Sequence, residues 1–196
     1  MIKDFFKSAG TNVIILVFSL AQGILISRLL KTEGRGEIAI YVGLYNMIYA
    51  FSNLGIRQSS SFFLSKKNYA VELIRKIQLS VISIATVLTT IILVVLFQTE
   101  GLYNTYNQVF LILTAPFALY TTYTTSFALS YRWIWKLNIV KILICVITFS
   151  GIFIFFGVLG EKELHYFFIS MFAANFITAI YAVSYTHLTL PTILLV

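Results

Sequence analysis

Six long apolar runs constrain the fold of this chain more than any other feature of its sequence. They lie at about residues 12–30, 38–54, 77–97, 109–129, 137–159 and 164–182, and most of the charges lie between them. A helix that rises about 1.5 Å per residue needs about 20 apolar residues to cross about 30 Å of hydrocarbon. The runs are close to this length, so we predict an all-α membrane protein with six transmembrane helices.

Composition supports the same fold class. Of 196 residues, 59% are hydrophobic and 11% are charged, whereas about a quarter of the residues in soluble domains are charged. The net charge is +7, and most of the 14 basic residues lie between the apolar runs and not in a folded basic patch. This pattern favours membrane topology over nucleic-acid binding. We therefore expect membrane lipids, and no nucleic acid, as partners.

Enzymatic and metal chemistry find little support in the sequence. Asp4 is the one aspartate of the chain, and no HExxH, GxSxG or phosphate-binding loop is present. The single cysteine, Cys145, lies inside an apolar run and has no companions for a metal site. We predict that it is a buried packing residue, and we expect neither enzyme activity nor a cofactor.

The distribution of basic residues predicts the orientation of the chain, because Lys and Arg are retained on the cytoplasmic face. Ten of the 14 basic residues fall on one side of the predicted spans: Lys3, Lys7, Arg57, Lys66, Lys67, Arg75, Lys76, Arg132, Lys136 and Lys141. The other four are Arg28, Lys31, Arg35 and Lys162. The amino terminus should therefore be cytoplasmic. We predict that residues 31–37 and 57–76 are connections between spans.

The end of the sequence breaks this pattern. The sixth apolar run continues into VSYTHLTLPTILLV without a charged cytoplasmic end. Most of this stretch resembles a translated sequencing-library adaptor that was read through in frame. We expect residues 183–196 to be an artefactual tail, residues 1–182 to form one six-helix bundle, and the native protein to continue past Ala182.

Several motifs in the first third of the chain carry a family resemblance. The first apolar run ends in ISRLL, Gly34-Arg35-Gly36-Glu37 follows as an expected turn, and NLGIRQSSSFFLSKK comes after the second run. This arrangement resembles the polysaccharide biosynthesis flippases of the multidrug, oligosaccharidyl-lipid and polysaccharide exporter superfamily. The likeness extends from about residue 8 to 67, and beyond it only the hydropathy and loop spacing agree.

The resemblance implies two six-helix bundles that open alternately to each face of the membrane, of which this chain is the N-terminal one. It also implies that the protein is an oligosaccharide (O-antigen) flippase in the bacterial inner (cytoplasmic) membrane. The substrate would be a lipid-linked oligosaccharide of the undecaprenyl-diphosphate type, used for lipopolysaccharide or other surface polysaccharide. A polysaccharide polymerase and a chain-length regulator are the further partners that the resemblance implies.

The residues leave three other functions open. A multidrug exporter of the same superfamily would need membrane-embedded acids for cation coupling, and the first five predicted spans contain none. A membrane glycosyltransferase or acyltransferase would need a catalytic His or Asp near the interface. A non-catalytic membrane scaffold is the third alternative.

The first two spans supply four candidate substrate-binding residues. Arg28 suits a phosphate because its guanidinium offers paired donors, although it could equally extend to the outer interface. Gln22 lies six residues earlier and therefore points about 120° away. Asn46 and Asn53 are seven residues apart and share a helix face with Tyr49, which we expect to look inward. That face would serve either a cavity or hydrogen bonds between helices.

The remaining candidates follow the second span and lie within the fourth. Arg57 would face the cytoplasmic mouth, where it could meet a diphosphate or simply act as a positive-inside residue. Thr121 and Thr124 lie in YTTYTTS after Pro116, which predicts either a hydroxyl-lined sugar pathway or hydroxyls bonded to their own helix. We predict that His165 is a lone interfacial residue rather than a proton relay.

Overall fold

All secondary structure that the computed structural model describes is helical. It describes residues 2–53, 55–66, 70–99 and 104–193, with side chains for the described residues from 7 to 184. The helices are α1 (Ile2–Leu29), α2 (Lys31–Ser52), α3 (Ile56–Lys66), α4 (Val71–Thr99), α5 (Thr105–Ser130), α6 (Ile134–Ile152), the π-helical η1 (Phe153–Val158) and α7 (His165–Ile193). The predicted all-α fold class is confirmed.

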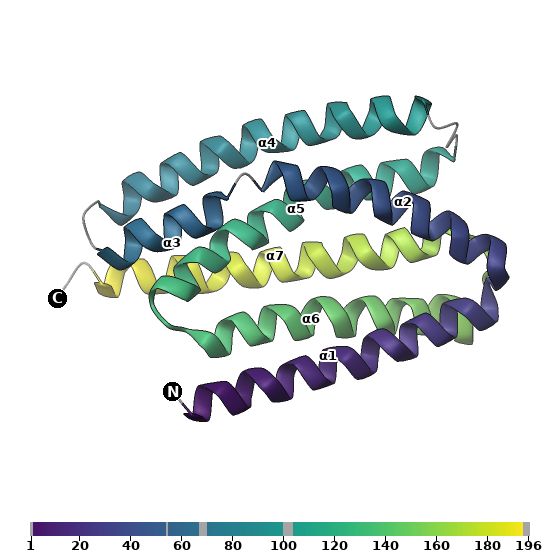
Figure 1. The fold of residues 1–196 in the computed structure, drawn as a ribbon, viewed down its shortest axis with the longest axis horizontal. Helices are drawn as coiled ribbons and strands as arrows, with labels where there is room; N and C mark the ends of the chain where they lie inside the picture. Colours follow the sequence, from purple (N-terminus) through teal and green to yellow (C-terminus); the bar gives the residue numbers. More distant parts are fainter. Residues whose placement is uncertain (1, 54, 67–69, 100–103, 194–196) are drawn as a thin grey trace.

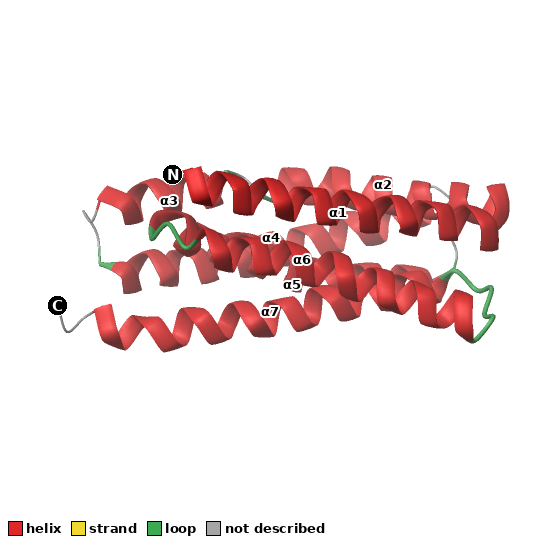
Figure 2. Cartoon of the chain, turned by 90° about the horizontal axis from the view of Figure 1, so that it is seen from below, coloured by secondary structure: helices red, strands yellow, loops and turns green. Residues whose placement is uncertain are grey.

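The helices lie side by side in an elongated bundle (Figures 1 and 2). The amino terminus, the end of α3 and the α5–α6 connection lie at one end, which we call the basic end (Figure 1). The α1–α2 and α6–α7 connections lie at the other, which we call the junction end. Helices α2 and α3 follow one another over the length that α4 covers alone (Figure 1). The chain therefore runs up and down the bundle with one interrupted pass.

Four helical segments are long and apolar enough to cross a membrane: Lys7–Leu29, Val71–Thr99, Ile134–Val158 and His165–Ser184. Their outer faces are apolar. On α1, Val13, Leu16, Val17 and Leu20 are exposed, and on α4 so are Ile84, Val87, Ile91 and Val95. Such surfaces suit contact with lipid rather than water. The four candidate spans are compatible with a multi-pass membrane protein, and six crossings remain a prediction.

Helix α5 lies in the middle of the bundle and packs against α7, α3 and α4. Its buried surface is partly polar and includes Thr114, Thr121, Thr124, Thr125 and Ser126. Towards the junction end a hydrophobic cluster surrounds it, formed by Tyr41, Phe97, Leu111, Ile152 and Phe168 together with their neighbours. Because these polar side chains are buried against neighbouring helices, they are shielded from hydrocarbon.

The predicted connection at residues 31–37 is wrong, because α2 begins at Lys31 and includes Gly34-Arg35-Gly36-Glu37. The chain reverses at Leu30 and Lys31, and Lys31 has a φ of 58°. The two glycines suggested a turn, but neither has a positive φ in the structure. Glu33 lies in the first turn of α2, where a negative charge stabilises the helix through its dipole.

The predicted connection at residues 57–76 is also largely helical. It contains most of α3 and the first residues of α4, which begins at Val71. Helix α3 escaped prediction because it is short and its apolar and polar residues are mixed. Ser60 and Leu64 are four residues apart and both are buried, so α3 presents one face to the bundle. Lys67 lies outside the described residues.

The sixth predicted span was expected to end at residue 182, but α7 continues as a helix to Ile193. Part of the predicted tail is therefore helical, and residues 194–196 lie outside the described part of the chain. A helical backbone is compatible with residues 183–196 being either a native segment or a translated adaptor. Their artefactual origin stays a prediction.

Gly151 provides a test of how α6 and α7 pack. A Cβ atom at this position would lie 2.5 Å from Ser170 Oγ and 2.7 Å from Ser170 Cβ. Gly151→Ala should therefore lower the free energy of unfolding by about 1–3 kcal/mol through overpacking. Thermal unfolding of the purified protein in detergent would show a lower Tm. Adding Ser170→Gly should recover part of the loss, and no recovery would contradict this contact.

Candidate functional site

The interruption between α2 and α3 organises the candidate site. Helix α2 ends at Ser52, and α3 begins at Ile56. Between them Gly55 adopts a φ of 66°, a left-handed conformation that favours glycine. Ending a helix leaves its last carbonyl groups without intrahelical partners. In a membrane bundle these carbonyls need other donors.

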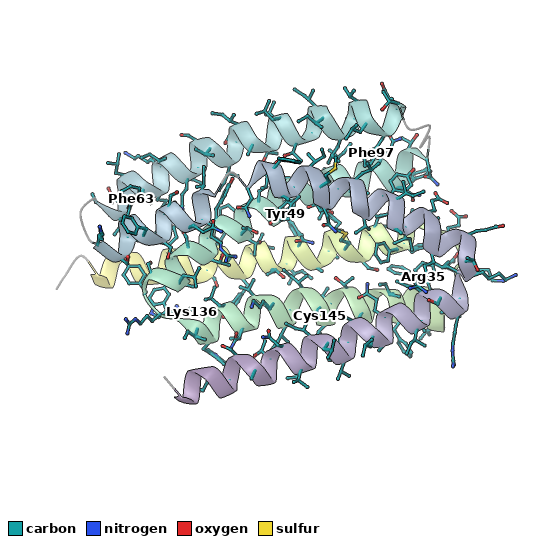
Figure 3. The ribbon with its side chains drawn as sticks, in the orientation of Figure 1. Arg35, Tyr49, Phe63, Phe97, Lys136 and Cys145 are labelled. Atoms are coloured by element: carbon teal, nitrogen blue, oxygen red, sulfur yellow. The ribbon has the colours of Figure 1, made fainter. Side chains whose placement is uncertain are left out.

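Helix α5 supplies a donor to the interrupted backbone. The hydroxyl of Tyr123 donates to the carbonyl of Ser52 at 2.9 Å and lies 3.4 Å from that of Asn53. One turn earlier on α2, Tyr49 donates to the carbonyl of Ala118 at 3.2 Å and hydrogen-bonds Thr122. Tyr49 lies near the middle of the bundle (Figure 3). The interruption is therefore held from the centre of the fold.

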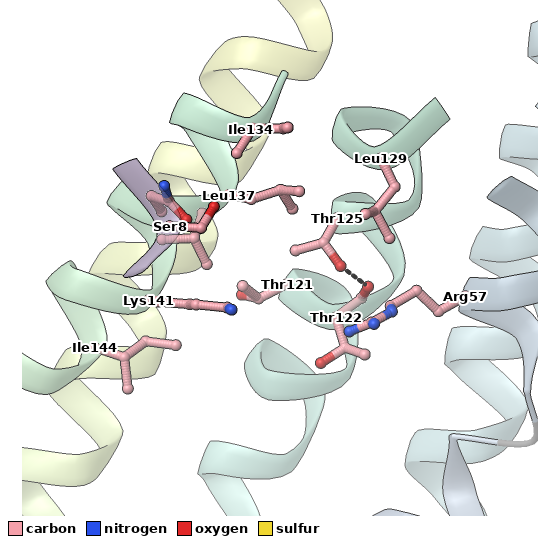
Figure 4. A pocket seen from close by; sticks show the side chains of 12 residues that line it. Ser8, Arg57, Thr121, Thr122, Thr125, Leu129, Ile134, Leu137, Lys141 and Ile144 are labelled. Atoms are coloured by element: carbon pink, nitrogen blue, oxygen red, sulfur yellow. Dashed lines mark hydrogen bonds between the residues drawn. The ribbon is translucent and has the colours of Figure 1, made fainter. Parts of the chain in front are cut away.

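A cavity with a volume of about 450 Å³ lies next to this interruption (Figure 4). Helices α1, α3, α5 and α6 contribute to its wall. The lining residues are Ser8, Arg57, Thr121, Thr122, Thr125, Leu129, Ile134, Leu137, Asn138, Val140, Lys141 and Ile144. Its volume falls within the range of small-molecule sites. We call it the basic cavity.

Two cations line the basic cavity from opposite sides. Arg57 extends from α3 and Lys141 from α6, with Thr121 and Thr122 of α5 between them (Figure 4). Among the described lining residues none is acidic. An anion entering this space would therefore meet two positive charges in surroundings less polar than water, where such attraction is strong.

Unpaired hydrogen-bond donors also indicate that the basic cavity suits an anion. Arg57 Nε and Asn138 Nδ2 are buried and have no partner in the described part of the chain. The hydroxyls of Thr121 and Thr125 instead donate to the carbonyls of Phe117 and Thr122 at 2.8 and 2.6 Å. The cavity therefore has an excess of donors. A ligand with several anionic oxygens, such as a phosphate, would satisfy them.

Arg57 lines the basic cavity together with Ser8, Leu129 and Ile134, which lie near the basic end. It is near the start of α3, which continues to Lys66. The intervening nine residues correspond to about 14 Å of helix. Its position at the cytoplasmic mouth stays a prediction, while the stretch after Arg57 folds as a helix rather than a loop.

Five of the seven predicted binding residues do not line the basic cavity: Gln22, Arg28, Asn46, Asn53 and Thr124. Arg28 is exposed in the last turn of α1, at the junction end, and Asn46 is exposed on α2. Gln22 lines a separate groove of about 490 Å³ between α1 and α6, which also includes Lys141 and Cys145. Cys145 is half-buried there, with its thiol 3.8 Å from the carbonyl of Ile15.

The other predicted residues, Thr121, Thr124 and Asn53, lie in different surroundings. Thr121 lines the cavity, whereas Thr124 is buried and donates to the carbonyls of Tyr120 and Thr121, both at 2.9 Å. Bonding of these hydroxyls to their own helix is therefore the arrangement found. Asn53 Oδ1 is buried without a partner among the described residues. The predicted inward face holds for Tyr49, which hydrogen-bonds α5, but not for Asn46, which is exposed.

Sequence reasoning missed Ser8, Asn138 and Lys141 as lining residues. Lys141 was counted only as a topology signal. Asn138 and Lys141 are three residues apart in an otherwise apolar run, so they lie on one side of a helix. That spacing was the signal that could have found them.

His165 was predicted to be alone, but its Nδ1 lies 3.0 Å from Glu163 Oε2. Its ring also lies 5.8 Å from that of Tyr106, centroid to centroid. This group is at the junction end, away from the basic cavity, so it does not contribute to the candidate site.

Comparisons with models of known protein families, with curated proteins and with solved structures found no match.

Tyr123→Phe tests whether the Tyr123 hydroxyl holds the α2–α3 interruption. Removing this group leaves the buried carbonyls of Ser52 and Asn53 without their donor, which should cost about 1–3 kcal/mol. The Tm of the purified protein should fall accordingly. Tyr120→Phe removes a hydroxyl from the same helix and should have a smaller effect. Equal shifts in the two variants would argue against a special role for Tyr123.

Proposed function

We propose that this chain is the N-terminal bundle of a flippase that moves a lipid-linked oligosaccharide across the bacterial inner membrane for surface polysaccharide synthesis. The observation that carries this proposal is the basic cavity within a bundle of apolar helices. A lipid-linked sugar of the undecaprenyl-diphosphate type combines a diphosphate with a long apolar chain. The basic cavity suits the diphosphate, and the apolar outer faces of the bundle suit the long apolar chain.

The chemistry of the cavity favours this substrate over a cationic drug. Arg57 and Lys141 would attract a diphosphate and repel a cation. Buried unpaired donors at Arg57 and Asn138 add hydrogen bonds that a phosphate oxygen accepts. A multidrug exporter of the same superfamily therefore becomes the less favoured transport function.

The proposal treats α2 and α3 together as one interrupted membrane crossing. With α1, α4, α5, α6 and α7 this gives six crossings, with a cytoplasmic amino terminus and the basic end in the cytoplasm. Discontinuous helices recur at the substrate sites of transporters, because their freed backbone groups and irregular geometry line a cavity. The position of Arg57 just after the interruption fits that arrangement.

Transport would require a second bundle, against which this one moves to open the cavity to each face in turn. A polysaccharide polymerase and a chain-length regulator would act on the translocated product and are proposed as partners. The site residues that the proposal uses are Arg57, Thr121, Asn138 and Lys141. Asn53 lies beside them at the interruption.

Binding of undecaprenyl diphosphate to the purified protein in nanodiscs tests the cavity directly. Arg57→Gln and Lys141→Gln should each weaken binding about tenfold or more, because each removes a hydrogen bond to a charged group worth about 1.5–3 kcal/mol. Undecaprenol, which lacks the diphosphate, should bind weakly and should be insensitive to both variants. Binding can be followed with a fluorescent analogue of the lipid.

Lys76→Gln is the matched control, since Lys76 is exposed on α4 near the same end and carries the same charge. It should leave binding unchanged. An equal loss in Lys76→Gln would mean that net charge alone attracts the lipid. Tighter binding of ethidium than of undecaprenyl diphosphate would favour the multidrug exporter.

Complementation tests transport itself. The complete reading frame, recovered from the source DNA past the codon for Ala182, should restore surface polysaccharide in a flippase-deficient strain. Arg57→Gln in that protein should reduce export at equal abundance, because the substrate loses a charged contact. Arg28→Ala should leave export unchanged if Arg28 only reaches the outer interface. Failure of the complete frame to restore export would overturn the flippase proposal.

A further inference from the structure

A groove between α1 and α6 adjoins the basic cavity. The two helices pack side by side along the bundle (Figure 1). The groove has a volume of about 490 Å³, which is within the range of small-molecule sites. Its polar lining comes from Asn12, Ser19 and Gln22 of α1 and from Lys141, Cys145 and Thr148 of α6. We call it the α1–α6 groove.

The α1–α6 groove continues the basic cavity towards the junction end. Lys141 and Ile144 of α6 line both spaces. On α1, Ser8 lines the cavity, and residues between 12 and 22 line the groove. Both helices run from the basic end towards the junction end (Figure 1), so the lining advances in the same direction on both walls. A ligand whose anionic part lies between Arg57 and Lys141 would therefore extend into the groove.

Three polar side chains of α1 face this groove from within a candidate membrane span. Among the described residues, the side chains of Asn12, Ser19 and Gln22 have no hydrogen-bond partner. The hydroxyls of Thr11 and Ser27, by contrast, donate to carbonyls of the same helix at 2.9 and 2.7 Å. Polar groups without partners are costly in hydrocarbon. The groove therefore favours an occupant that forms hydrogen bonds.

The groove side of α1 differs from its apolar outer side. Val13 is 60% exposed, and Gln22 follows nine residues later, after about 900° of helical rotation. The two side chains therefore point in opposite directions. Phe18 contacts Phe149 of α6, with ring centroids 5.2 Å apart, which holds the two helices together. The polar residues of α1 thus gather towards α6 and not around the whole helix.

We propose that the α1–α6 groove binds the sugar next to the diphosphate of the lipid-linked substrate, an inference that rests on the proposed flippase function. Amide and hydroxyl side chains both donate and accept hydrogen bonds, as sugar hydroxyls do. Asn12, Ser19 and Gln22 supply this neutral mixture. Lys141 stands at the boundary, since it lines the groove and the basic cavity. The charged and the neutral parts of one ligand would thus meet the two kinds of lining in the right order.

Displacement of a fluorescent undecaprenyl diphosphate analogue from the purified protein in nanodiscs tests the groove. Undecaprenyl diphosphate that carries one N-acetylglucosamine should compete about tenfold better than undecaprenyl diphosphate itself, because additional neutral hydrogen bonds form. Gln22→Leu should remove most of that advantage and leave the affinity for undecaprenyl diphosphate unchanged. The Tm of this variant should not fall, since leucine replaces an amide without a partner among the described residues.

Asn46→Leu is the matched control, because Asn46 is an exposed amide on α2 outside the groove. It should leave both affinities unchanged, and a loss equal to that in Gln22→Leu would contradict the sugar subsite. Equal binding of the two lipids to the unaltered protein would overturn the subsite and leave the diphosphate site standing. A loss of both affinities in Gln22→Leu would also overturn it. Binding of neither lipid would instead contradict the flippase function itself.

Discussion

The hydrogen bond from Tyr123 to the end of α2 is the interaction on which the candidate site depends. An interrupted helix is unfavourable in hydrocarbon because each freed carbonyl must find a donor. Tyr123 is fully buried in α5 and supplies that donor. The interruption in turn sets the start of α3 and therefore the position of Arg57. One hydroxyl on the central helix thus links the backbone geometry of α2 and α3 to the charge in the basic cavity.

The same central helix explains why hydropathy alone describes this bundle incompletely. Helix α5 is the most enclosed part of the described fold, yet it is not among the four candidate spans. Its hydroxyls bond to their own helix, as Thr121 and Thr125 do, and its neighbours shield them from lipid. The helices with exposed faces, such as α1 and α4, must instead be apolar on the outside. Hydropathy therefore reports contact with lipid better than it reports position in the bundle.

The lengths of the apolar runs made part of this fold predictable from the sequence. Prediction failed for the features that contacts between helices determine. The fold class and the four apolar helices were predictable because lipid imposes a length and a composition. Helix α3 was not predictable, because its short amphipathic pattern can be recognised only once its packing against α5 is known. Arg57 and Thr121 were predicted as site residues from chemistry alone. Asn138 and Lys141 were missed because pairing them with Arg57 requires knowing that α6 lies across from α3. Arg28 was predicted from residue type and Asn46 from its spacing to Asn53, and the fold places both outside the cavity.

Opposite charges lie along the same pair of helices. Glu37 is on α2 before the interruption, and Arg57 comes after it on α3. On α5, the amide of Asn107 donates to Glu37, and Asn107 and Thr121 are separated by 14 residues, or about 21 Å of helix. Between them α5 carries Leu111, Ala115 and Ala118, which are buried and apolar. These residues and the buried Thr114 separate Asn107 from Thr121 along α5. The α2–α3 interruption lies between Glu37 and Arg57 on this path, and the Tyr123 hydroxyl, bonded to the carbonyls of Ser52 and Asn53, fixes it against α5.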